Sequence, residues 1–280
     1  MDLTRAFYDF CIPLQNDKIK LISILKEALK LGYRTVAIEE IYDHSQKENK
    51  KSSDIFPSPV ELDFLEEFNG RLRILRRLTI IYSDVNISHP MSNSLNLKKY
   101  DLIAGLPKND NALNHCYTSF AGDLICFNPD ASNLFIQRKP YQVAVARGMF
   151  IEIKYSDAIQ NSTYRKDIIK IAHNYHVKGK SKNIIISSGA KSVFELRGPY
   201  DIANLALIFG LSEEQGKSSI SSLCRMLFLK AEGRRLGKTN TIAKLKDIEE
   251  NDSSENEDME MDNIFEADFS EQPFKKKKIS

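Results

Sequence analysis

The chain has 280 residues, 42% of them hydrophobic, and is therefore long enough to bury a large core. Its four cysteines form no CxxC pair, which argues against a disulfide scaffold or a zinc ribbon. No run approaches the roughly 18 apolar residues that a membrane span requires, and the first residues lack the apolar segment of a secretory signal. We therefore expect no membrane partner and a cytosolic or nuclear location.

The formal net charge of +2 hides a difference between the body of the chain and its end. Residues 238–280 contain 7 Lys/Arg and 12 Asp/Glu, which leaves 33 and 26 of the totals of 40 and 38 for residues 1–237. The body thus has a balance of +7 and the end a balance of −5. A basic body is compatible with a polyanionic partner.

Seven short apolar runs alternate with helical patterns along residues 1–237. We expect these runs to form strands at 7–12, 35–38, 78–82, 102–106, 124–127, 150–153 and 183–186. They are almost continuously apolar, which is typical of parallel strands that are covered on both faces. Repeated strand–helix units of this length favour an α/β fold, a TIM-like barrel of about seven parallel strands with surrounding helices.

The helices between these runs have recognisable ends. After the first run, apolar residues follow helical spacing from Leu21 to Leu29. Asn16 or Asp17 can cap the start of this helix, and Gly32 suits its end because a glycine adopts the left-handed conformation readily. A second helix is predicted over about 160–177.

The last part of the body is predicted to be purely helical. Pro199 suits the first turn of one helix, and Gly210 ends it. Ser212 and Gln215 then form a capping-box signature, which predicts a further helix that reaches about Ala231.

We therefore divide the chain into a barrel domain at 1–237 and an acidic tail at 238–280. Residues 247–274 contain no Lys or Arg and all 12 acids of the tail, a composition that predicts disorder. The tail ends in a run of four lysines, Lys275, Lys276, Lys277 and Lys278. This run is either a solvated terminus or a nuclear import signal.

Barrels of this kind carry catalytic groups at the carboxyl ends of their strands. The polar residues expected there are Asp9, Glu39, Glu40, Asp84, Ser187 and Ser188. A hydrolytic metal centre usually recruits histidine as well, whereas His173 and His176 lie apart from these residues on a predicted helix, where ordinary packing explains them. We expect no catalytic residue, metal or cofactor, although a metal-dependent phosphoesterase on the same barrel remains the alternative.

Small residues follow the seventh run, at Ser187-Ser188-Gly189. Their backbone N–H groups could bind an anion, because small residues that precede a helix leave such groups exposed. The spacing is neither that of a P-loop nor that of a dinucleotide-binding turn.

Basic residues at loops and element ends are the candidate RNA contacts. They are Arg76, Arg77, Arg138, Lys139, Arg147, Arg165, Arg197, Arg234 and Arg235. Guanidinium groups suit this role because their planar fork matches two phosphate oxygens; a solvated surface charge is the plainer interpretation of each residue. A DNA-binding helix-turn-helix over 202–228 is disfavoured, because its second helix would begin with acidic residues that duplex phosphates repel.

Several motifs resemble those of the thirty-kilodalton protein subunit family of ribonuclease P and ribonuclease MRP, over about residues 1–237. They are Arg77-Leu-Thr-Ile-Ile-Tyr-Ser-Asp84, Tyr100-Asp-Leu-Ile-Ala-Gly-Leu-Pro107, Glu152-Ile-Lys-Tyr-Ser-Asp-Ala158, Asn183-Ile-Ile-Ile-Ser-Ser-Gly-Ala190 and Glu195-Leu-Arg-Gly-Pro-Tyr-Asp-Ile-Ala-Asn-Leu205. The last two are the most specific. The first strand departs from the family pattern, since only Asp9 corresponds, and it lacks the His-x-His pair of the related metal hydrolases.

The resemblance implies a barrel related to metal hydrolases and a protein that assists a catalytic RNA. Such a subunit would take part in tRNA 5′-end maturation and ribosomal RNA processing in the nucleus, in particular the nucleolus. Its implied partners are the catalytic RNA, precursor tRNA and other protein subunits of the particle. Within the matching motifs we expect Arg77, Arg147 and Arg197 to contact RNA, as guanidinium groups at a barrel mouth that has lost its imidazole ligands.

Overall fold

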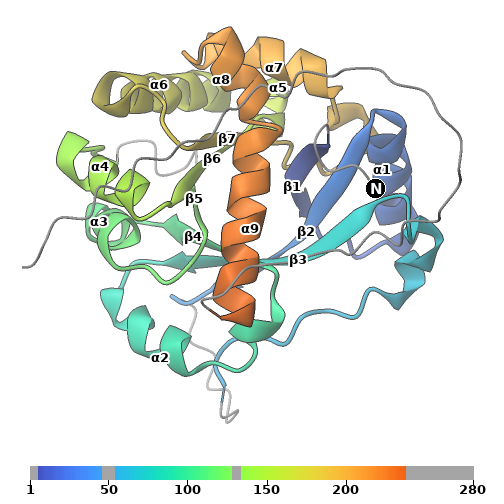
Figure 1. Cartoon of the computed structure of the whole chain (residues 1–280), viewed down its shortest axis with the longest axis horizontal. Coiled ribbons are helices and arrows are strands. Elements are labelled where there is room, and N and C mark those ends of the chain that lie inside the picture. The colour runs from blue at the N-terminus through green and yellow to red at the C-terminus, as the bar shows by residue number, and fades with distance from the viewer. Residues whose placement is uncertain (1–5, 46–53, 128–133, 238–280) are drawn as a thin grey trace, which may run out of the picture. The chain divides into compact units, whose positions relative to one another are not determined.

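Parallel strands in simple chain order form the centre of the protein in the computed structural model, which describes residues 6–45, 54–127 and 134–237. Each strand pairs in parallel with the next one along the chain, and helices lie around them (Figure 1). Within the described residues the strands are β1 (Phe7–Pro13), β2 (Tyr33–Asp43), β3 (Arg73–Tyr82), β4 (Leu102–Pro107), β5 (Leu124–Cys126), β6 (Phe150–Lys154) and β7 (Ile184–Ser187). The predicted TIM-like barrel of about seven parallel strands is confirmed.

The helices connect successive strands and then continue beyond β7. They are α1 (Lys18–Lys30), α2 (Ser88–Asn93), α3 (Asp110–Thr118), α4 (Arg138–Ala146), α5 (Ser156–Gln160), α6 (Ser162–Gly179), α7 (Pro199–Ile208), α8 (Glu213–Ser218) and α9 (Ser222–Leu236). Short 3-10 turns lie at Asp63–Phe68, Val85–Ile87, Leu97–Lys99 and Val193–Glu195. As the sequence predicts, the Asp17 side chain caps α1, and Ser212 and Gln215 form a capping box at α8.

The barrel closes without a regular ladder between β7 and β1. On the carboxyl side of the seam, Gly189 N donates to Cys11 O at 2.8 Å. On the other side the link between α8 and α9 lies between the two strands: Tyr8 N donates to Ile220 O at 3.1 Å and Ile186 N to Ser219 O at 3.2 Å. Backbone N–H groups at the facing edges of β1 and β7 therefore donate to this link and not to the opposite strand.

The same link explains why the predicted helix from Ser212 to about Ala231 is wrong. The structure divides this segment into α8 and α9, with Ser219, Ile220 and Ser221 between them. The carbonyl groups of Ser219 and Ile220 accept hydrogen bonds from β7 and β1, so tertiary contacts override the continuous helical pattern.

Helix α9 covers the amino-terminal end of the barrel and crosses in front of the strands (Figure 1). Its buried residues Cys224, Leu227 and Ala231 belong to one apolar cluster with residues near the starts of the strands, such as Leu75 and Phe150. Leu227 is completely buried. The helix therefore closes this end of the barrel with apolar side chains.

Strand β3 begins five residues earlier than the apolar run predicts, at Arg73 rather than at Leu78. Arg73, Arg76 and Arg77 consequently lie within the strand and not before it. Successive side chains of a strand point to opposite faces, so Leu75, Arg77 and Thr79 share the face that looks into the barrel.

The predicted tail at 238–280, with Lys275, Lys276, Lys277 and Lys278, lies outside the described residues. The described residues all belong to one compact unit, Met1–Asn240. Over the part of the chain that the structure describes, no helix has the length and apolar character to cross a membrane.

We predict that Leu227→Ala lowers the free energy of unfolding by about 2–5 kcal/mol, because it leaves a cavity between α9 and the strands. Urea unfolding measures this change. Met226→Ala on the same helix is the matched control, because its side chain is 57% exposed and its loss should cost within about 0.5 kcal/mol. Equal losses for the two variants would mean that α9 does not seal the barrel.

Candidate functional site

Charged side chains lie inside the barrel, where an apolar core would be expected. Glu39 (β2), Arg77 (β3), Glu152 and Lys154 (β6) form what we call the interior charge cluster. Glu39 and Arg77 are register partners on adjacent strands, and Glu152 and Lys154 are two residues apart on one strand, so the alternation of side chains turns all of them inward.

Arg77 and Glu152 make a two-point ion pair across the barrel. Arg77 Nη1 lies 2.5 Å from Glu152 Oε1, and Nη2 lies 2.6 Å from Oε2. The remaining donors of the guanidinium reach Phe10 O (2.6 Å), Cys126 Sγ (2.9 Å) and Thr79 Oγ1 (3.2 Å). All sides of this fully buried arginine are therefore bonded to the protein.

Glu39 is held just as completely. Its Oε1 accepts from Lys154 Nζ (2.7 Å) and Thr79 Oγ1 (2.6 Å) and lies 3.2 Å from Arg77 Nη2. Its Oε2 accepts from the Cys11 thiol at 3.2 Å. Two cations and two carboxylates thus give the interior charge cluster a formal charge of zero.

The pKa values of the two glutamates follow from these contacts. Burial alone would raise the pKa of Glu39, but the charges of Lys154 and Arg77 outweigh it and lower this pKa to about 2. Burial likewise opposes ionisation of Glu152, and the Arg77 guanidinium overcomes it, so its pKa is lowered. Both glutamates are therefore carboxylates at neutral pH.

A divalent metal does not fit this donor set. The oxygens of both glutamates already accept from Arg77, Lys154 and neighbouring hydroxyl or thiol groups. A cation introduced between them would meet the positive charges of Arg77 and Lys154 at close range. Within 6–45, 54–127 and 134–237, no three His, Cys, Asp or Glu side chains are placed to bind a metal ion. The interior charge cluster supports no metal-dependent step.

Asp9 lies beside the cluster, in the middle of β1 rather than after it. Its Oδ1 accepts from Ser188 N (2.9 Å) and Cys11 N (3.2 Å), whereas its buried Oδ2 has no hydrogen-bond partner among the described residues. Burial raises the pKa of Asp9 to about 6.

The anion site predicted at Ser187-Ser188-Gly189 is wrong. Ser188 N is occupied by Asp9, Gly189 N donates to Cys11 O, and Ala190 N donates to the Ser188 hydroxyl. These backbone groups join β7 to β1 and are not free for a ligand.

The other predicted strand-end residues lie apart. Glu40 points away from Glu39 and accepts hydrogen bonds from Val60 N and the Tyr100 hydroxyl. Asp84 is exposed and caps the turn at Val85–Ile87. Of the carboxylates expected at the strand ends, Glu40 and Asp84 therefore do not lie with Asp9 and Glu39.

The two histidines of α6 have structural contacts. His173 Nε2 lies 3.0 Å from Ile208 O, and His176 Nδ1 lies 3.2 Å from Ser181 Oγ. Packing is therefore the right interpretation of both.

Arg77 was expected to contact RNA, and this prediction is wrong. Its side chain is 0% exposed and neutralises Glu152 inside the barrel. The hypothesis that Arg77, Arg147 and Arg197 form one basic barrel mouth fails with it. The reason is the strand register, which turns Arg77 inward beside Glu39.

Arg147, Arg165 and Arg197 bind backbone carbonyls near them. Arg147 donates to Tyr117 O and Phe120 O at the end of α3, and Arg165 donates to Ala158 O in α5. Arg197 donates to carbonyls of the preceding turn at 2.7 Å. These guanidinium groups stabilise helix and turn ends; an additional RNA contact by any of them remains a proposal.

Arg234 and Arg235 fasten α9 to the barrel. Arg234 Nε lies 2.9 Å from buried Asp123, and Arg235 pairs with Asp101 and Glu232. Asp101 also accepts from the backbone N of half-buried Arg76 at 2.8 Å.

Besides the exposed Arg165, the exposed members of the predicted set are Arg138 and Lys139, in the first turn of α4. Neither forms a hydrogen bond or ion pair with another described residue, so both charges face solvent. RNA contact by them stays a prediction.

Sequence reasoning missed Glu152, Lys154, Thr79 and Cys126, which complete the interior. A signal was present in Phe150–Lys154, where Glu152 and Lys154 alternate with apolar residues. Read with a period of two, this pattern places both charges on one face of a strand.

Fold and interior together define a parallel α/β-barrel protein whose central charges are paired with one another. The family model of the RNase P subunit p30 matches residues 6–236, which is most of the domain just described. The chain belongs to this family of ribonuclease P protein subunits, as the motifs in the sequence indicate.

Two relatives agree with this membership, and a solved structure shares the fold. The chain is 35% identical over 257 residues to the mouse ribonuclease P protein subunit p30, covering 89% of this chain and 95% of that protein. It is 25% identical to the ribonuclease P/MRP protein subunit RPP1 of Saccharomyces cerevisiae, over 81% of this chain and 76% of that one. A chain in a cryo-EM structure of archaeal ribonuclease P with mature tRNA shares the fold, with a TM-score of 0.60, 11% identity, and 87% and 100% coverage.

We predict that Arg77→Gln lowers the free energy of unfolding by about 3–5 kcal/mol, because it leaves two buried carboxylates without their main cation. Chemical denaturation measures this loss. Glu152→Gln should lower the free energy of unfolding less in the Arg77→Gln background than in the wild type, because the two side chains interact directly. Arg138→Gln, at an exposed position, is the control and should change stability by within about 0.5 kcal/mol. Additive losses would contradict the ion pair.

The raised pKa of Asp9 predicts a pH dependence of stability. Between about pH 4 and pH 6 the folded state holds the Asp9 proton more tightly than the unfolded state, so this contribution is lost as the pH rises through 6. Asp9→Asn removes this pH dependence of stability. As the pH rises from about 4 to about 6, the free energy of unfolding of the variant should increase by up to about 3 kcal/mol relative to that of the wild type.

Denaturation at a series of pH values tests this prediction, and Glu39→Gln supplies a comparison of opposite sign. The pKa of Glu39 is lowered, so its stabilisation is present above about pH 4.5 and is lost as the pH falls toward 2. A constant difference between Asp9→Asn and the wild type would show that Asp9 does not titrate in this range.

Proposed function

We propose that this chain is a protein subunit of the ribonuclease P and ribonuclease MRP particles, which binds RNA and other protein subunits and does not itself cleave RNA. In this role it supports tRNA 5′-end maturation and ribosomal RNA processing. The observation that carries the proposal is the match to the RNase P subunit p30 family over residues 6–236. Service in both particles is supported by the name of the yeast relative.

The interior charge cluster supports the non-catalytic part of this proposal. The carboxylates that a phosphoesterase would offer to a metal are bonded to Arg77 and Lys154. The alternative of a metal-dependent phosphoesterase therefore has no observation in its favour.

A nuclear place of action is supported by eukaryotic relatives that are ribonuclease P subunits, from mouse and yeast. The nucleolus and the import role of Lys275, Lys276, Lys277 and Lys278 are further parts of our proposal. A fusion to a fluorescent protein, compared with a variant in which these four lysines are alanines, tests both.

Affinity purification of the full chain from cells at moderate salt should recover the ribonuclease P RNA and an activity that cleaves precursor tRNA at its 5′ end. The purified chain alone, with precursor tRNA and Mg²⁺, should show no turnover. Sequencing of the bound RNA and a single-turnover cleavage assay are the measurements.

Two results would contradict the proposal. One is recovery of the full chain without any ribonuclease P or MRP RNA. The other is turnover by the isolated chain that disappears with Glu39→Gln, because a metal-bound carboxylate would then be at work.

A further inference from the structure

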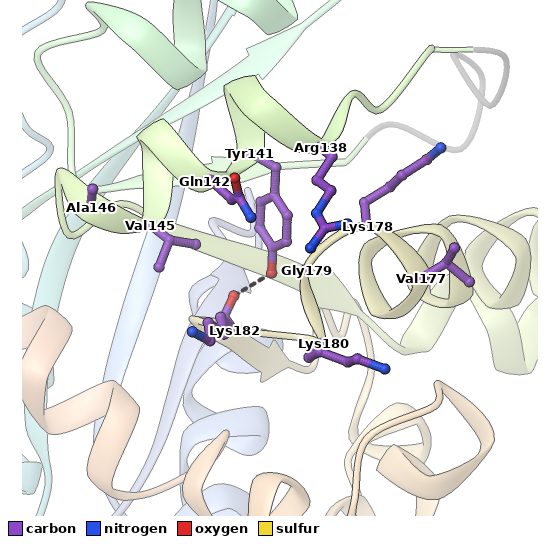
Figure 2. Close-up of a pocket in the computed structure, with 10 residues that line it drawn as sticks. All are labelled: Arg138, Tyr141, Gln142, Val145, Ala146, Val177, Lys178, Gly179, Lys180 and Lys182. Carbon is purple, nitrogen blue, oxygen red and sulfur yellow. Dashed lines mark hydrogen bonds between the residues drawn. The ribbon is translucent and has the colours of Figure 1, made fainter.

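A basic groove lies between α4 and the end of α6, outside the residues so far considered together. It has a volume of about 560 Å³ and is lined by four cations, Arg138, Lys178, Lys180 and Lys182. Figure 2 shows Arg138 and Tyr141 extending from α4 toward the end of α6, with the lysines along the opposite wall. None of the lining residues is acidic. We call this feature the α4–α6 groove; its positive potential suits a polyanion.

The wall that carries the lysines is held in a fixed shape. The Tyr141 hydroxyl donates to Lys182 O, and Gln215 Nε2 donates to Lys180 O at 2.9 Å. The ring of Tyr141 packs so closely on Gly179 that no side chain fits there. Lys180 and Lys182 are therefore presented by a rigid turn and Lys178 by the end of α6, which reduces the ordering that a ligand must impose.

Three residues of this turn are in the left-handed conformation although none is glycine. Lys180, Ser181 and Asn183 have φ angles of 58°, 56° and 56°. Each such residue costs on the order of 1 kcal/mol, so the tertiary contacts of the turn maintain it against local preference.

An exposed aromatic ring lies at the rim of the groove. The Phe135 side chain is 62% exposed, and Lys178 Nζ lies 6.0 Å from the centre of its ring. The backbone beneath the ring is anchored, because Phe135 N donates to Asp110 Oδ1 at 2.8 Å and the next residue, Ile136, is buried. The ring thus faces solvent on a fixed support beside the cations.

We propose that the α4–α6 groove binds an unpaired segment of RNA, with phosphates on Arg138 and the lysines and a base stacked on Phe135. This inference rests on the proposed function and specifies the RNA element that one surface of the chain takes. Single-stranded RNA is favoured because its bases are free to stack on an aromatic ring while its backbone follows a basic groove. An acidic protein segment would account for the cations but not for the exposed ring.

The test compares full-length variants for binding to a short labelled polyuridine, by fluorescence anisotropy at several salt concentrations. The variant with Lys178, Lys180 and Lys182 changed to alanine should bind at least about tenfold more weakly, and the slope of log K against log salt should fall by about 2. Phe135→Ala should weaken binding about fivefold or more and leave this slope unchanged, because it removes stacking and no charge.

Matched controls separate the groove from general surface effects. Lys166→Ala and Lys170→Ala remove exposed charges from the same helix α6, outside the groove, and should change affinity by less than about twofold. Phe194→Ala removes a ring that is 89% exposed elsewhere on the protein. Unchanged thermal unfolding of each variant shows that it is folded.

The outcomes are distinct. Two results overturn the proposal. One is an equal loss of affinity for polyuridine in the groove variants and the control variants. The other is that Phe135→Ala weakens binding to a fully paired RNA stem as much as it weakens binding to polyuridine. The proposal is also overturned, in favour of an acidic protein partner, if the wild type does not bind polyuridine and the lysine variant fails to recover one protein subunit of the particle. The proposed function is judged by a different result, the recovery of ribonuclease P RNA when the wild-type chain is purified from cells. If that RNA is recovered, the proposed function stands even where the groove proposal fails; if it is not recovered, the proposed function is refuted.

Discussion

The ion pair between Arg77 and Glu152 joins two strands that are not neighbours in the sheet, and the centre of the barrel is arranged around it. Because both side chains are fully buried, each charge needs a partner at short range, and Glu39, Thr79 and Lys154 complete the set. The pairing fixes the distance between β3 and β6. It also binds the carboxylates that a metal would require, so the chemistry available to the barrel follows from the same contacts that hold it together.

Because the interior charge cluster is paired within itself, the charges available to a partner lie on the outer surface of the described residues. The arginines there divide into two groups. Arg147, Arg165 and Arg234 bind carbonyls or acids of the fold, as guanidinium groups at helix ends often do. Arg138 and the lysines around the α4–α6 groove face solvent instead. Charge alone therefore does not identify a binding surface; the partners that each charge already has within the chain must be known as well.

The sequence was sufficient to predict the barrel, the approximate positions of its strands and the family, because apolar runs, capping residues and motifs are local signals. Arg77 could not be placed from local signals, since a residue beside an apolar run can lie before a strand or inside it. The register with Glu39 on β2 and the ion pair with Glu152 across the barrel decide its place. The break between α8 and α9 escaped prediction for a similar reason, because its cause is hydrogen bonds to Tyr8 and Ile186, far away in sequence.

The link at Ser219 and Ile220 also sets an order of events during synthesis. The N–H of Tyr8 is synthesised more than two hundred residues before its backbone acceptor, the carbonyl of Ile220. Until then the edges of β1 and β7 are unpaired and the amino ends of the strands lack the cover of α9. Contacts of such long sequence separation form slowly, so the nascent protein remains dependent on protection from aggregation until α9 has been made.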